Sequence, residues 1–266
     1  MMISKTQSNN LYFTSRHASI RKGDDIVRKV NCEFPMFSPI YASMHWKTMG
    51  NEGSDLNYNY KIFNQKFHQK LSEIRRNEDL TPDNPFFLDS FELAKKYKLG
   101  NCRESSILTL GALFANGYYQ SRKIYPSIKV DVYDKDNNPV FDTIYVCDHV
   151  AILSLIKNEQ NKKKSQFVVL DGWFNCAMDY YEAQSKFKQI YYKNDIPSAI
   201  NVAKQRLENK IGTLKFYLNS FLKKYRYETQ FFISYHEDEI FTKEQAKENG
   251  QKIAKKYPNI LLDSVK

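Results

Sequence analysis

Three residues whose types suit nucleophilic catalysis occur in the order Cys102, His149 and Asp171. Cys102 follows Asn101 at the predicted start of a helix, where peptide dipoles stabilise negative charge and so favour a thiolate. A thiolate attacks the carbonyl carbon in acyl transfer, and the backbone N–H groups of a first helical turn can bind an oxyanion. We therefore interpret Cys102 as a nucleophile; the alternative is a small residue of the core.

His149 and Asp171 are predicted to lie on neighbouring strands. His149 begins the apolar segment DHVAIL, and Asp171 ends the apolar segment QFVVLD. If 148–156 and 166–171 pair as an antiparallel hairpin through the polar loop 157–165, a loop centred on residue 160 places the two residues opposite each other, with Cβ atoms about 5 Å apart. A loop centred on residue 161 makes them diagonal neighbours about 7 Å apart. Either register lets the carboxylate orient the imidazole; the alternatives are a structural histidine and a turn-forming aspartate.

The motifs GNCRES, DHVAIL and VVLDGW resemble, in order and placement, those of the transglutaminase-like, papain-related cysteine enzymes, over about residues 100–175. The chain looks most similar to the deamidase domains of bacterial effectors. This resemblance implies a Cys-His-Asp triad in an α+β fold, where the cysteine helix packs on an antiparallel sheet bearing His149 and Asp171. Two positions depart from the pattern, because Val150 follows the histidine in place of an aromatic residue and Gly172 follows the aspartate in place of proline or alanine.

The resemblance implies that the chain transfers an acyl group of a protein substrate. We expect deamidation or transglutamination of a Gln side chain, because no long lid or second wall separates the motifs as a protease groove requires. A cysteine protease is the alternative, and a non-catalytic basic module that binds a host protein or a membrane surface is a second. Asn101 is expected to cap the helix or to contact an oxyanion, and Trp173 to line a substrate channel or to pack.

No cofactor is expected. Cys32, Cys147 and Cys176 together suggest zinc, but the chain has no C-x-x-C pair and no second histidine beside His149, so we disfavour a metal site. No glycine-rich phosphate motif is present either, which argues against nucleotide-dependent catalysis.

The composition indicates a folded protein with a basic surface. The 266 residues are 42% hydrophobic and 15% aromatic, which excludes extensive disorder. The net charge is +10, but Lys+Arg total 40 with Arg in the minority, so nucleic acid is an unlikely partner. Lys, Asn, Ile and Tyr are abundant, as in proteins encoded by AT-rich genomes. The sequence contains no apolar stretch long enough to span a membrane and no signal-peptide core, so we expect a cytoplasmic protein or one secreted into a host cell without a cleaved signal.

The predicted organisation is a loosely ordered segment at 1–30 followed by a single α+β catalytic domain at 31–266, with a helical extension over about 180–266. Asn101 and Glu104 form a predicted capping box at the cysteine helix. Hydrophobic periodicity predicts helices at 60–76, 85–98, 102–116, 198–225 and 242–256, and strands at 127–133, 140–146, 148–156, 166–171 and 229–235.

Overall fold

The computed structural model describes residues 18–36, 66, 69–70, 72–73, 87–98, 100–140, 142–147, 149–157, 165–211 and 225–263. The chain divides into two units, each assembled from distant parts of the sequence. Unit 1 combines Met1–Lys123, Ala151–Met178 and His236–Lys266, and unit 2 combines Ile124–Val150 and Asp179–Tyr235. Helices and antiparallel strands occur in both, so the class is α+β, as predicted.

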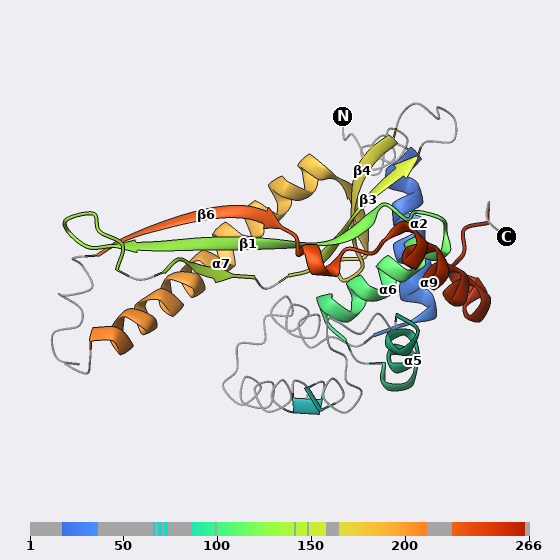
Figure 1. Cartoon of the computed structure of the whole chain (residues 1–266), viewed down its shortest axis with the longest axis horizontal. Coiled ribbons are helices and arrows are strands. Elements are labelled where there is room, and N and C mark those ends of the chain that lie inside the picture. The colour runs from blue at the N-terminus through green and yellow to red at the C-terminus, as the bar shows by residue number, and fades with distance from the viewer. Residues whose placement is uncertain are drawn as a thin grey trace, which may run out of the picture. The chain divides into compact units, whose positions relative to one another are not determined.

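Unit 1 is built of helices around a small sheet (Figure 1). Helices α2 and α6 pack against strands β3 and β4, and helices α5 and α9 pack against α6. The unit also includes the start of β1, most of β5 and two 3-10 turns, η2 and η3. The elements span α2 Ala18–Glu33, α5 Phe87–Tyr97, α6 Cys102–Ala115, β3 Ala151–Lys157, β4 Ser165–Asp171, β5 Cys176–Asp179, η2 Glu237–Glu239, α9 Lys243–Lys256 and η3 Pro258–Ile260.

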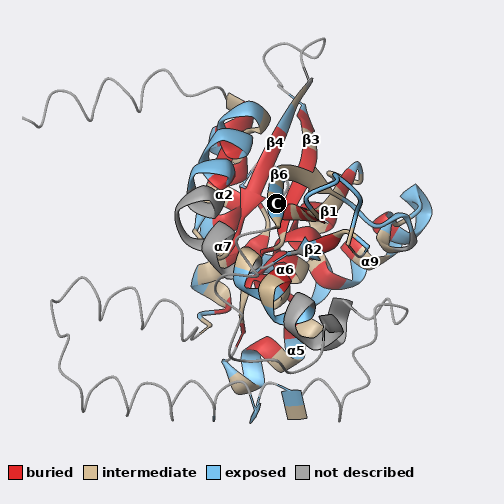
Figure 2. Ribbon diagram, turned by 90° about the vertical axis from the view of Figure 1, so that its left-hand side faces the viewer, coloured by how far each residue is buried: buried red, intermediate tan, exposed pale blue. Residues whose placement is uncertain are grey.

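Helix α6 lies at the centre of unit 1 because it is apolar on nearly every side. Its residues Leu108, Leu110 and Leu113 are fully buried, and Figure 2 shows the helix and the two central strands largely in the buried colour. Gly111 lies so close to Phe91 of α5 that a Cβ atom would approach its ring to 2.7 Å. A small residue at this position therefore allows the helices to pack closely.

Strands β3 and β4 pair in the register of a loop centred on residue 161, one of the two registers predicted. Ile152 is opposite Leu170 and Lys157 is opposite Ser165. Continuing this register places Ala151 opposite Asp171. The strand prediction was wrong at its start, because β3 begins at Ala151 and His149 precedes it by two residues.

Unit 2 has a three-stranded antiparallel arrangement in which β1 is central. Strand β1, Ser121–Tyr133, pairs with β2, Ile144–Val146, and with β6, Arg226–Ser234. Helix α7, Tyr180–Ile211, contacts β6. The even-numbered residues of β1 from Ile124 to Val132 are buried, which is the alternation expected of a strand with one covered face.

Three predicted features of the organisation differ from the structure. Residues 18–30 are not loose, because they belong to α2, whose Ile26, Val27 and Val30 are fully buried; residues 1–17 lie outside the described part. The helix expected at 198–225 begins earlier, at Tyr180, and is described as far as Ile211; residues 212–224 lie outside the described part. The predicted single domain at 31–266 is divided between the two units.

The strands predicted at 127–133 and 140–146 correspond to β1, which begins earlier at Ser121, and to β2, which begins later at Ile144. The helices at 85–98, 102–116 and 242–256 correspond to α5, α6 and α9, and the late strand at 229–235 overlaps β6. Most of the helix predicted at 60–76 lies outside the described residues. Within the residues described, no helix is long and apolar enough to cross a membrane.

Candidate functional site

Cys102 is the first residue of α6, and it is 9% exposed. Asn101 precedes it as the N-cap: the Arg103 N–H donates to Asn101 Oδ1 at 2.9 Å, and the Asn101 N–H donates to Glu104 Oε2 at 2.9 Å. The predicted capping box is therefore confirmed. The Asn101 side-chain oxygen accepts a bond within the cap, as the capping interpretation requires, and an oxyanion contact of its amide NH2 group stays a prediction.

Asp171 ends β4 and is fully buried. Its Oδ1 accepts the backbone N–H groups of Trp173 at 3.1 Å and Phe174 at 3.0 Å, so it forms the turn that leads into β5. The Asn31 amide of α2 donates to the Gly172 carbonyl at 2.9 Å and holds the same turn. Asp171 therefore forms a turn, and its role in orienting the imidazole stays a prediction.

Gly172 brings the end of β4 directly against α6. A Cβ atom at Gly172 would lie 2.5 Å from Thr109 Oγ1 and still closer to Ser105 Oγ. Residues Cys102, Ser105 and Thr109 follow helical spacing and share one face of α6. The face that begins with Cys102 therefore packs against the residue next to Asp171.

The structure adds Ser105 to the surroundings of Cys102. Its side chain is buried, and its Oγ has no hydrogen-bond partner among the described residues. The Thr109 hydroxyl one turn further donates to the Ser105 carbonyl at 2.8 Å. Sequence reasoning missed both hydroxyls, although their spacing from Cys102 is the signal that places them on its face.

His149 belongs to unit 2, whereas Cys102 and Asp171 belong to unit 1. Its side chain is 5% exposed, and its ring packs against Phe187 of α7 with ring centroids 5.5 Å apart. The Cys147 thiol donates to the His149 carbonyl at 3.4 Å. Each unit is described by itself, so the structure brings together the regions of Cys102 and Asp171 and leaves the position of His149 relative to them as a prediction.

The remaining candidates have structural roles. The Trp173 ring is half-buried and packs on Phe174 with centroids 5.5 Å apart, which supports packing; a substrate-channel role stays a prediction. All four cysteines are thiols, and Cys32 and Cys147 are exposed. Among the described residues, no three His, Cys, Asp or Glu side chains form a group that could hold a metal ion.

Comparison with known proteins yields no relative. No protein-family model matches the chain, and no curated protein or solved structure is significantly similar to it.

Proposed function

We propose that this chain is a cysteine-dependent acyl-transfer enzyme that acts on a Gln side chain of a protein substrate. In this proposal Cys102 is the nucleophile, His149 the general base and Asp171 the residue that orients the imidazole. The strongest support is the packing of Gly172 on the helix face that begins with Cys102, because Asp171, whose carboxylate is buried, directly precedes Gly172 in the chain.

The short chain segment between His149 and β3 supports a role for His149 in the proposed site. Val150 alone separates His149 from Ala151, the first residue of β3. Two residues of extended chain span at most about 7 Å. Ala151 is opposite Asp171 when the observed register is continued, so the short chain segment limits how far the His149 backbone can lie from Ala151.

The proposed reaction has two halves. His149 accepts the Cys102 proton, and the thiolate attacks the carboxamide carbon to form a carbon–sulfur bond. Backbone N–H groups at the start of α6 stabilise the oxyanion. The carbon–nitrogen bond breaks as His149 returns the proton to the leaving ammonia, which leaves a thioester. Water then forms a carbon–oxygen bond and releases the thiol, giving Glu in place of Gln; an amine in place of water gives a transglutaminated product.

Proteolysis and non-catalytic binding are the competing functions. A deamidase requires a narrow slot for one side chain, whereas a protease must bind extended backbone on both sides of the scissile bond. We favour the side-chain reaction because the sequence provides no long lid between its three motifs. Secretion of the chain into a host cell as a bacterial effector stays a prediction of the sequence.

The products formed in a eukaryotic cell lysate test the proposal. Lysate is treated with the wild-type protein, with Cys102→Ala and, as a matched control, with Cys32→Ala, which removes an exposed thiol. We expect Gln sites that gain the small mass of conversion to Glu, or that gain an amine, with the wild type and Cys32→Ala but not with Cys102→Ala. New N-termini that depend on Cys102 would indicate a protease instead. Identical lysates in all three treatments would contradict catalysis.

A further inference from the structure

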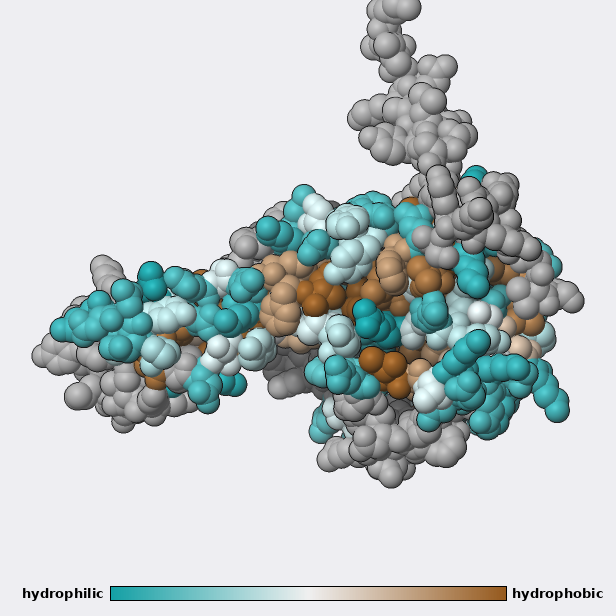
Figure 3. All heavy atoms as spheres, turned by 45° about the horizontal axis from the view of Figure 1, so that its top comes forward, coloured by the Kyte–Doolittle hydropathy of each residue, from teal (hydrophilic) through white to brown (hydrophobic). Residues whose placement is uncertain are grey.

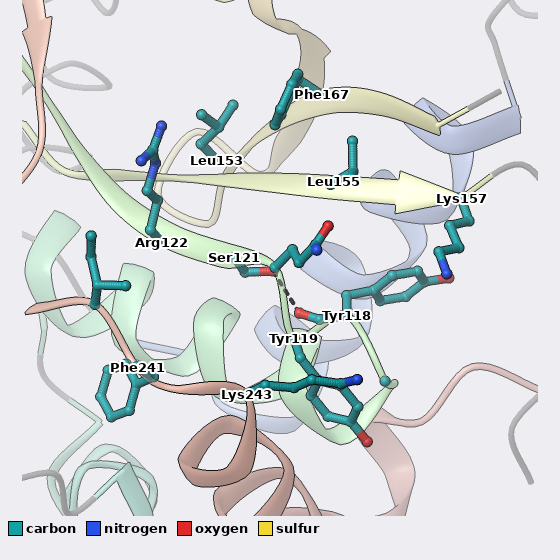
Figure 4. Close-up of a pocket in the computed structure, with 13 residues that line it drawn as sticks. Tyr118, Tyr119, Ser121, Arg122, Leu153, Leu155, Lys157, Phe167, Phe241 and Lys243 are labelled. Carbon is teal, nitrogen blue, oxygen red and sulfur yellow. Dashed lines mark hydrogen bonds between the residues drawn. The ribbon is translucent and has the colours of Figure 1, made fainter. Parts of the chain in front are cut away.

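A second candidate site lies in unit 1 at the opposite end of α6 from Cys102. It is a cavity of about 640 Å³ lined by residues that follow α6, by β3 and β4, and by the start of α9 (Figure 4). Because α6 has 14 residues and a helix rises 1.5 Å per residue, the cavity is about 20 Å from Cys102. We call it the β3–β4 groove. Its lining residues are Gly117, Tyr118, Tyr119, Gln120, Ser121, Arg122, Leu153, Leu155, Lys157, Phe167, Ile240, Phe241 and Lys243.

The floor of the β3–β4 groove is apolar. Leu153 and Leu155 lie on the face of β3 opposite to Ile152 and Ile156 of the main core cluster. Leu153 is buried at 8% exposure and Leu155 is half-buried. Phe167 is directly opposite Leu155 and is 55% exposed. Figure 3 shows that apolar side chains are exposed beside hydrophilic ones on the face it presents. A contiguous apolar surface with a polar border marks an interaction site.

The border of the β3–β4 groove is basic. Arg122, Lys157 and Lys243 line it, and the described lining includes no acidic residue. Figure 4 shows Arg122 beside Leu153 at one end and Lys157 at the other. Residues 153 and 157 are four positions apart on one strand, which is about 13 Å. The two cationic side chains therefore lie at opposite ends of the apolar floor and do not converge on a single point.

We propose that the β3–β4 groove binds an extended peptide segment of a partner protein that carries two carboxylates about four residues apart with apolar residues between them. An extended peptide advances about 3.3 Å per residue, so carboxylates four residues apart match the spacing of the basic ends. The apolar residues between them cover Leu155 and Phe167. Aromatic and Arg side chains are enriched at such interfaces, and opposite charges speed association.

This inference goes beyond the proposed catalysis and does not depend on it. The groove belongs entirely to unit 1, and Cys102 does not line it. A Cys102→Ala protein is therefore expected to bind the segment as well as the wild type does. Loss of catalysis and loss of binding are separate outcomes.

Fluorescence anisotropy with synthetic peptides tests the groove on the full chain. The probe is a fluorescein-labelled peptide with the core Asp-Leu-Phe-Leu-Asp. The controls replace both Asp residues with Lys, replace the three apolar residues with Ser, or shorten the core to Asp-Leu-Asp. We expect the probe to bind at least tenfold more tightly than each control. Its binding should weaken as salt is raised, because Lys157 is exposed and Arg122 is only half-buried. Equal binding of the four peptides, or none, would overturn the proposal.

Three variants locate the binding. Phe167→Ser and Lys157→Glu are each expected to lower the affinity for the probe peptide at least tenfold. Both residues are exposed, so circular dichroism of the variants should show the wild-type fold. Lys247→Glu makes the same charge change at an exposed position of α9 outside the groove and is expected to bind like the wild type. Wild-type binding by Lys157→Glu would refute the site. Suppose that the wild type binds none of the peptides yet sediments with vesicles of phosphatidylserine and phosphatidylcholine. If Lys157→Glu abolished that sedimentation, the groove would be assigned to a membrane surface instead.

Discussion

The packing of Gly172 on α6 predicts a large effect of Gly172→Ala. The added Cβ would lie 2.5 Å from Thr109 Oγ1 and 3.1 Å from the Ser105 carbonyl oxygen, and closer still to Ser105 Oγ. The Thr109 hydroxyl cannot rotate away without losing its hydrogen bond to Ser105. The carbonyl belongs to the helix backbone and cannot move alone. The end of β4 and α6 must therefore separate to admit the methyl group.

We expect this overpacking to lower the free energy of unfolding by about 2 kcal/mol, within the range of about 1–3 kcal/mol for added methyl groups in packed interiors. A loss of this size lowers the melting temperature by roughly 4–8 °C for a folding unit of about 150–250 residues. Thermal unfolding followed by circular dichroism measures the shift in the wild type and the variant.

Removal of the two hydroxyls provides the control. A Ser105→Ala, Thr109→Ala background removes both hydroxyl oxygens, so of the three close contacts only the one with the Ser105 carbonyl oxygen remains. In this background Gly172→Ala should lower the free energy of unfolding by about 1 kcal/mol less than it does in the wild type. An equal cost in both backgrounds, or no cost in the wild type, would refute the close approach of β4 to α6 on which the proposed Cys102–Asp171 arrangement depends.

Three further outcomes are expected. Asp171→Asn should keep its turn, because an amide oxygen accepts the same N–H groups, but should lose most turnover because the amide favours the wrong imidazole tautomer; full turnover with an unchanged melting temperature would reduce Asp171 to a turn residue. Asn101→Ala should lower the free energy of unfolding by about 1 kcal/mol and slow alkylation of Cys102, and wild-type melting and labelling would contradict this role of the cap. The pKa of Asp134 is held below its usual value chiefly by the Asn138 N–H. The stabilisation from this carboxylate should be complete above the unfolded pKa of about 3.9 and lost as pH falls through the lower folded pKa; a carboxyl NMR titration midpoint at or above the unfolded value would refute it.

The sequence predicted the elements whose signals are local. Helix α6 combines a capping box at Asn101 and Glu104 with apolar residues on every side, so both its start and its burial were predictable. Strand β4 is a short apolar run that ends at an aspartate, and the loop length limited its register with β3 to a small number of choices.

Other elements depend on contacts between distant residues. Helix α2 was missed because Gly23 interrupts its apolar stripe, yet Gly23 is buried where a Cβ would lie 2.8 Å from Ala177 Cβ. Helix α7 continues through Pro197, where the sequence predicts a break. The division into two units follows from the pairing of β1 with the distant β6, which no local pattern encodes.

In the candidate site, too, some features were predictable from local sequence and others depend on contacts between distant residues. The helix start at Cys102 and the strand end at Asp171 were predictable from short motifs, whereas the approach of Gly172 to Ser105 and Thr109 required the folded structure. The β3–β4 groove was not predictable, because its lining comes from three separate parts of the sequence.

The rate at which each cysteine of the native protein reacts with iodoacetamide tests the proposed enzyme most directly. Exposure alone predicts that Cys32 and Cys147, which are exposed, react before Cys102, which is 9% exposed. A catalytic thiolate predicts that Cys102 reacts first near neutral pH, and that His149→Gln slows it at least tenfold while the other thiols are unchanged. Peptide mass spectrometry gives the rate at each site. Labelling in the order of exposure, unaffected by His149→Gln, would contradict the assignment of Cys102 as a nucleophile.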